Sequence, residues 1–168
     1  MDFCTVINEI KQKREEFCKI LVSFVLTDSI LFVEKDLLNQ DCGKSIIDAV
    51  NVANGILNTE YEISNGVDVL PINQLQSEKI EKYLKLISLE KFCVIYLVAI
   101  ELRSVLLGVL FVEEKFDVNK IFELAFFEEL YEQIKWGVVD EITQRHLQIK
   151  NILDETKGFC IERGLHKN

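Results

Sequence analysis

The stretch "LEKFCVIYLVAIELRSVLLGVLFVEE", residues 89–114, decides the fold because it is apolar on nearly every side of a helix. Such a segment either crosses a membrane or lies at the centre of a soluble protein. Glu101, Arg103 and Ser104 stand near its middle, where charged side chains would be costly in a bilayer. We therefore expect one buried central helix over 89–112. Since an unpaired buried guanidinium is unfavourable, a carboxylate or a helix-end carbonyl should lie beside Arg103 if it is buried.

Amphipathic segments surround this central one. Apolar residues recur at helical spacing over 5–26, 44–57, 74–87, 117–136 and from 138 to about 158, with Ser88 and Asp117 as helix caps. The segment "SILFVE" (29–34) fits a strand or a turn into a helix, and "EYEIS" (60–64) alternates before an Asn-Gly turn signal. The expected fold class is mainly α (α+β): a helical bundle around a buried central helix, with a small β element.

Length and charge limit the classes of protein. The 168 residues suffice for one domain, expected over 5–158 with a tail at 159–168. The net charge is −9, from 19 basic and 28 acidic residues, which disfavours nucleic acid and membrane insertion. An acidic surface keeps a protein soluble, and it also suits a basic or apolar protein partner.

Cysteine usage and the opening segment indicate a reducing compartment. The five cysteines are odd in number and none is in CxxC spacing, so neither a disulfide framework nor a zinc site is expected. The opening "MDFCTVINEI" lacks the pattern of a signal peptide, and its acids argue against a mitochondrial leader. A cytoplasmic location is expected.

Catalytic and cofactor motifs are scarce. The sequence contains no phosphate-binding glycine loop, and we expect no metal, no cofactor and no catalytic residues. His146 lies among charges on an amphipathic segment, where a solvated or edge histidine is the common case. A small cysteine-dependent enzyme with His146 as its base remains an alternative, as does an unrelated helical adaptor.

A family resemblance appears in the C-terminal half. Arg103 and Ser104 precede an apolar run, and the stretch "FFEELYEQIKWGVVDE" (126–141) then ends a capped helix in a spaced Glu, aromatic, Trp and Gly pattern. This arrangement resembles the Atp12 family of F1-ATPase assembly chaperones. The positions that match are Phe127, Glu128, Tyr131, Trp136 and Gly137.

The resemblance covers most of residues 5–158, with two departures. Asp140 takes the place of an acid, but Thr143 and Gln144 stand where the family usually has His and Asp. Family members also carry an N-terminal, β-rich domain, and this chain is expected to correspond to the C-terminal domain alone.

The resemblance implies a function and a set of residues. It implies a bacterial chaperone that binds the unassembled α subunit of F1 and masks its apolar surface. The expected partner-binding residues are Glu128, Glu129, Tyr131, Lys135 and Asp140. Arg103, Ser104, Trp136 and Gly137 are expected to be structural, with a buried Trp136 plugging one helix against the next and Gly137 making the turn.

Overall fold

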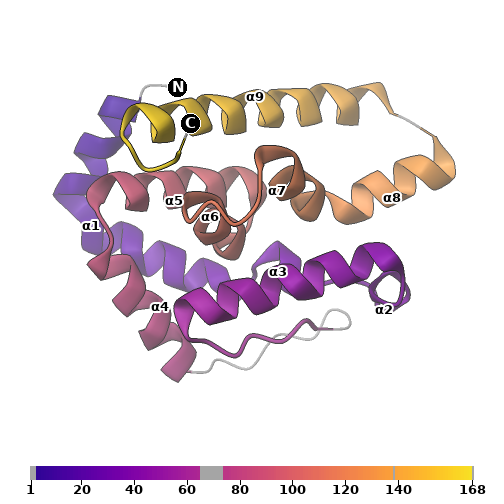
Figure 1. The fold of residues 1–168 in the computed structure, drawn as a ribbon, viewed down its shortest axis with the longest axis horizontal. Coiled ribbons are helices and arrows are strands. Elements are labelled where there is room, and N and C mark those ends of the chain that lie inside the picture. Colours follow the sequence, from indigo (N-terminus) through magenta and orange to yellow (C-terminus); the bar gives the residue numbers. More distant parts are fainter. Residues whose placement is uncertain (1–2, 65–73, 138, 168) are drawn as a thin grey trace.

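The computed structural model describes residues 3–64, 74–137 and 139–167, and this part of the chain is almost entirely helical. Its helices, shown in Figure 1, are α1 (Phe3–Val25), α2 (Lys35–Leu38), α3 (Asp41–Leu57), α4 (Gln74–Leu86), α5 (Leu89–Leu102), α6 (Val105–Val112), α7 (Val118–Ala125), α8 (Phe127–Trp136) and α9 (Asp140–Glu162), with a 3-10 turn, η1, at Ser29–Leu31. The prediction of a mainly α fold is confirmed.

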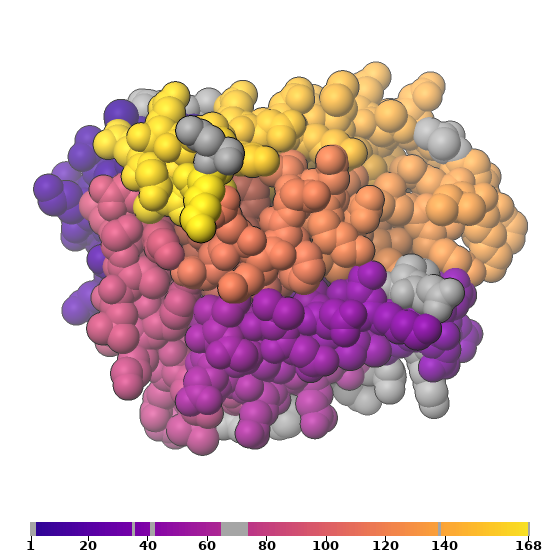
Figure 2. All heavy atoms as spheres, viewed as in Figure 1, coloured from indigo at the N-terminus to yellow at the C-terminus, as the bar shows by residue number. Residues whose placement is uncertain are grey.

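The helices form layers around α5 and α6. Helix α9 runs along one side of this pair and α3 along the other, while α1 and α4 close one end (Figure 1). Helix α8 stands at the opposite end, beyond α7, where Figure 2 shows it at the edge of the molecule. The core is therefore central, and α8 lies at its periphery.

The expected single central helix over 89–112 is wrong, because the segment is two helices. Helix α5 ends at Arg103, which adopts a left-handed conformation with φ 56°, and α6 then folds back against α5. Ser104 begins α6 as its N-cap, its Oγ accepting a hydrogen bond of 3.0 Å from the N–H of Leu107. A serine that can cap a new helix offers the backbone an alternative to continuing the old one.

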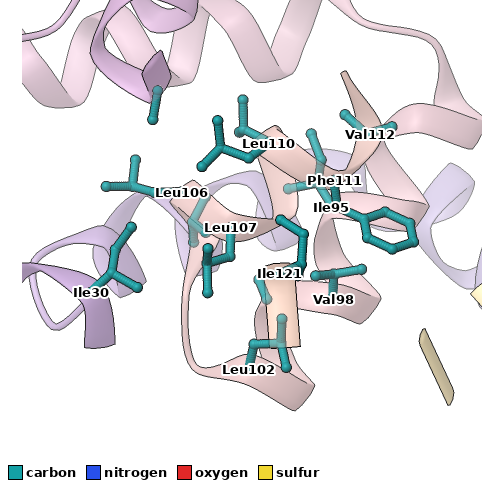
Figure 3. Packing of buried hydrophobic residues seen from close by; sticks show 14 of the residues in the cluster. Ile30, Ile95, Val98, Leu102, Leu106, Leu107, Leu110, Phe111, Val112 and Ile121 are labelled. Atoms are coloured by element: carbon teal, nitrogen blue, oxygen red, sulfur yellow. The ribbon is translucent and has the colours of Figure 1, made fainter. Parts of the chain in front are cut away.

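Burial of the segment is nevertheless as expected for a core. Every residue of α6 is buried, and Figure 3 shows its side chains interdigitating with Ile95, Val98 and Leu102 of α5. Gly108 permits this close approach, since a Cβ at that position would lie 2.9 Å from the carbonyl oxygen of Ile95. Ile100, by contrast, remains 44% exposed.

A buried carboxylate joins the 3-10 turn to the start of α6. Asp28 is fully buried, and its Oδ2 accepts a hydrogen bond of 2.9 Å from the N–H of Leu106, while Oδ1 accepts one of 3.4 Å from Ile30. Burial raises the pKa of Asp28 to about 6, although the N–H of Leu106 and the hydroxyl of Ser104 oppose the rise by hydrogen bonding. Asp28 thus caps a helix from outside it.

Other segments refine the expectations. The small β element is not shown: among the described residues the only pairing is an isolated bridge between Phe32 and Ser64, and the Asn-Gly turn lies outside them. The helix expected over 117–136 divides at Phe126 into α7 and α8. Asp117 caps α7 as predicted, accepting a hydrogen bond of 2.8 Å from the N–H of Lys120.

The C-terminal residues pack on the core where a frayed tail was expected. Helix α9 continues to Glu162, and the ring of Phe159 stacks on Phe3 of α1 with centroids 4.5 Å apart. Beyond the helix, the His166 ring lies 5.4 Å from that of Phe111. No helix in the described ranges is long and apolar enough to span a bilayer.

Candidate protein-binding site

Helix α8 is held to the molecule without any fully buried side chain of its own. Its first turn is tied to the region around α2 by two hydrogen bonds. Glu128 Oε1 accepts one of 3.1 Å from the N–H of Glu34, and Gln40 Nε2 donates one of 3.2 Å to the hydroxyl of Tyr131. Two of the expected partner-binding residues therefore also position α8.

A third expected residue, Glu129, connects α8 to α9. Its carboxylate accepts a hydrogen bond of 2.8 Å from Arg145 and lies 3.0 Å from Nε2 of His146. The expectation of a solvated or edge His146 is wrong, because the imidazole is buried against Phe122 and Phe126, with ring centroids 5.1 Å and 4.8 Å away. Glu129 and His146 thus orient each other at the base of the α8–α9 arm, defined as residues 127–147.

Trp136 lies outside the core, so the expectation of a buried plug is wrong. Its side chain is 78% exposed, and Lys135 Nζ lies 5.2 Å from the centre of its ring. The reason is positional: α8 stands at the edge of the molecule, and its last turn extends past the helices that could cover it. Gly137 does make the expected turn, with φ 99°, and α9 starts at Asp140 on the far side of it.

Apolar exposure is concentrated on this arm. Ile134 is 87% exposed, and Val139 and Leu147 are more than half exposed as well. Exposed apolar side chains that gather in one region of a soluble protein are typical of binding sites. The combination predicts a surface for a protein rather than for a small polar ligand.

An apolar groove runs along α8 where it faces α7 and α3. The groove encloses about 210 Å³ and is lined by Ser45, Lys120, Glu123, Leu124, Phe127, Leu130, Tyr131 and Ile134. Four of these side chains follow the i, i+3, i+4, i+7 spacing of one helix face, starting at Phe127. This stripe was not predicted from the sequence, because the predictions for this helix rested on its acids and on Trp136.

A second, larger hollow of about 530 Å³ lies beneath the arm, between the end of α5 and helix α9. Its wall includes Arg103, Glu101 and Arg145. Arg103 is exposed, so its guanidinium is not the buried charge that would have needed an acceptor. Ser104 remains structural, as expected, through its capping hydrogen bond.

The residues expected to bind a partner are brought to the arm, but on different faces. Glu128, Glu129 and Tyr131 make contacts within the molecule, whereas Lys135 and Asp140 are exposed at the arm's tip. These contacts lie within the molecule and do not show which residues touch a partner.

The described residues give little support to the cysteine-enzyme alternative. Burial raises the pKa of the Cys93 and Cys160 thiols to about 12 and raises that of Cys18 as well, which disfavours thiolates at neutral pH. His146 is engaged with Glu129 and two phenyl rings. Within the same described ranges, His, Cys, Asp and Glu residues form no cluster of three or more that could hold a metal.

Comparison with known proteins shows which of them share this fold. No family model and no curated protein matches the sequence. Solved structures do share its fold. The fold is that of Atp12: the crystal structure of Atp12 from Paracoccus denitrificans superposes with a TM-score of 0.83 at 14% identity, covering 92% of this chain and 67% of that one.

Two further structures agree. The D202K mutant of the Paracoccus protein gives the same TM-score and coverage. A protein from Agrobacterium tumefaciens, provisionally described as a chaperone, matches with a TM-score of 0.75 at 15% identity, over 90% of this chain and 57% of that one. The predicted Atp12-like fold is confirmed.

Proposed function

We propose that this chain is an assembly chaperone that binds the unassembled α subunit of the F1 sector of ATP synthase. The observation that carries the proposal is the Atp12-like fold, which extends over 92% of the chain. The residues of 126–141 support it independently, since their spacing in the sequence resembles the pattern of the same family.

Masking of apolar surface gives such a chaperone its mechanism. A subunit that will later pack against a neighbour exposes an apolar patch beforehand, and such patches drive aggregation. Covering the patch needs exposed apolar side chains on the chaperone, and the arm offers Ile134 and Trp136. The net charge of −9 keeps the free chaperone soluble and speeds its encounter with basic regions of the client.

The proposed contact residues are those of the arm: Glu128, Glu129, Tyr131, Lys135 and Asp140. Lys135 and Asp140 are exposed and can reach a client directly. Glu128, Glu129 and Tyr131 set the position of α8 through their internal hydrogen bonds, so they contribute to binding by holding the arm as well as by contact.

Co-expression with the α subunit tests the proposal. The chain should raise the soluble amount of α subunit in proportion to its own amount, because no phosphate-binding loop for a nucleotide-driven cycle exists in the sequence. Glu128→Lys should weaken this effect. Glu78→Lys, an equal change of charge at an exposed position of α4, at the end of the molecule away from α8, is the matched control.

The outcomes separate function from site. If wild type yields no more soluble α subunit than an empty vector, the chaperone proposal fails. If Glu128→Lys and Glu78→Lys act alike while circular dichroism shows both folded, Glu128 has no specific role.

A further inference from the structure

The apolar stripe of α8 divides between the core and the groove. Phe127, Leu130 and Tyr131 are half-buried and pack against the core, whereas Ile134 at the open end is 87% exposed. An amphipathic helix in a globular protein normally turns its whole apolar stripe into the core. Here the stripe also lines the 210 Å³ groove, together with Leu124 of α7.

The opposite rim of the groove is polar and already engaged. Lys120 Nζ donates a hydrogen bond of 3.1 Å to Ser45 Oγ and lies 3.8 Å from the carboxylate of Glu123. Its positive charge is therefore balanced at the rim. The groove itself offers apolar contact along its length and polar contact at its edge, which is the arrangement that receives one face of a helix.

The surroundings of the groove carry an excess of negative charge. Between residues 120 and 141 the acids are Glu123, Glu128, Glu129, Glu132, Asp140 and Glu141, against Lys120 and Lys135 as the bases. Arg145 offsets Glu129 from α9, at 2.8 Å. The remaining acids leave a negative margin that attracts a positively charged partner and repels an acidic one.

We propose that this groove binds an amphipathic helix of the client protein, whose apolar face is flanked by Lys or Arg side chains. The inference rests on the proposed chaperone function and specifies the chemistry of what is held. The apolar face of the incoming helix fills the groove between Phe127 and Ile134, and its basic flanks meet the acids of α8 and of the start of α9.

Synthetic peptides test the chemistry without the client. A helical peptide with Leu at i, i+3, i+4 and i+7 and Lys elsewhere is compared with one of the same pattern carrying Glu in place of Lys. Binding is followed by the anisotropy of a label on the peptide.

Variants then locate the binding. Ile134→Ser should weaken binding of the Lys peptide about tenfold or more, because an exposed apolar side chain that becomes buried in a contact typically contributes over 1 kcal/mol. Leu86→Ser is the matched control, since Leu86 is 75% exposed on α4, at the end of the molecule away from α8. It should bind the Lys peptide as wild type does.

Each outcome decides between alternatives. Equal binding of the Lys and Glu peptides overturns the charge preference, and unchanged binding by Ile134→Ser overturns the groove. A dimer in sedimentation that Ile134→Ser disperses would assign the groove to a second copy of the chain and overturn the client helix. If the Lys peptide binds in the groove but the chain fails to solubilise the α subunit, the groove stands and the chaperone proposal falls. If Ile134→Ser still solubilises the α subunit, the chaperone proposal stands and the groove proposal falls.

Discussion

Replacement of Asp28 by Asn should make the stability of this protein less dependent on pH. The carboxylate is fully buried, and burial raises its pKa from 3.8 to about 6. In the unfolded chain the group ionises near its ordinary value. Between these two pKa values the folded protein therefore holds a proton that the unfolded chain has lost.

The sign and size of the pH effect on stability follow from the difference between the two pKa values. Because the folded state binds more protons in this window, wild type loses stability as the pH rises from about 4 to above 6. The shift from 3.8 to about 6 corresponds to about 3 kcal/mol at 1.36 kcal/mol per pH unit. Asn lacks the ionisation but keeps an oxygen that can accept the hydrogen bond from Leu106. The free energy of unfolding of Asp28→Asn, relative to wild type, should therefore rise by about 2–3 kcal/mol from pH 4 to pH 7.

Urea denaturation of both proteins at a series of pH values measures this difference. Other carboxylates titrate equally in the two proteins and cancel from it. Asp28→Ala serves as a second variant: it removes the acceptor for Leu106 and Ile30 and should be less stable than Asp28→Asn by about 1–3 kcal/mol. A stability difference between Asp28→Asn and wild type that stays constant across the pH range would refute the reasoning.

Three more predictions concern the core, the arm and the thiols. Gly108→Val should lower the free energy of unfolding in urea denaturation by about 1–3 kcal/mol, because the new side chain would contact Ile95. Gly55→Ala on α3, where a Cβ meets nothing within 4 Å, should be neutral or stabilising, and equal losses of stability in the two variants would contradict the close packing of α5 on α6. Trp136→Ala should leave the free energy of unfolding within about 0.5 kcal/mol of wild type, and a loss of several kcal/mol would place the ring in the core after all. Iodoacetamide at neutral pH, followed by peptide mass mapping, should modify exposed Cys4 well before buried Cys93 and Cys160, and labelling of Cys93 at the rate of Cys4 would revive the enzyme alternative.

Much of the fold could be predicted because local signals agreed with the tertiary structure. The apolar run over 89–112 was bound to be central, and Ser88, Asp117 and Gly137 cap or end helices through their own side-chain or backbone chemistry. The break at Arg103 could not be read from periodicity, since a run that is apolar on all sides gives no sign of where its direction reverses.

The errors at the candidate site have a common cause. Burial of Trp136 and His146 depends on which distant helix lies beside each, and hydrophobicity alone assigns a tryptophan to the core and a histidine to solvent. His146 is buried because Phe122 and Glu129 come from α7 and α8, and Trp136 is exposed because no described helix extends beyond the end of α8. The stripe from Phe127 to Ile134 could be recognised in the sequence, but the exposure of Ile134 at its end could not.

Direct formation of a complex between the purified chain and the α subunit tests the central claim. The α subunit, diluted from denaturant in the presence of an equimolar amount of the chain and without nucleotide, should remain soluble and sediment with it as a defined complex. Ile134→Ser should reduce the amount of that complex, while Leu86→Ser should not. If the α subunit aggregates to the same extent with the chain as with an unrelated acidic protein, and no complex sediments, the account of this protein as an assembly chaperone is contradicted.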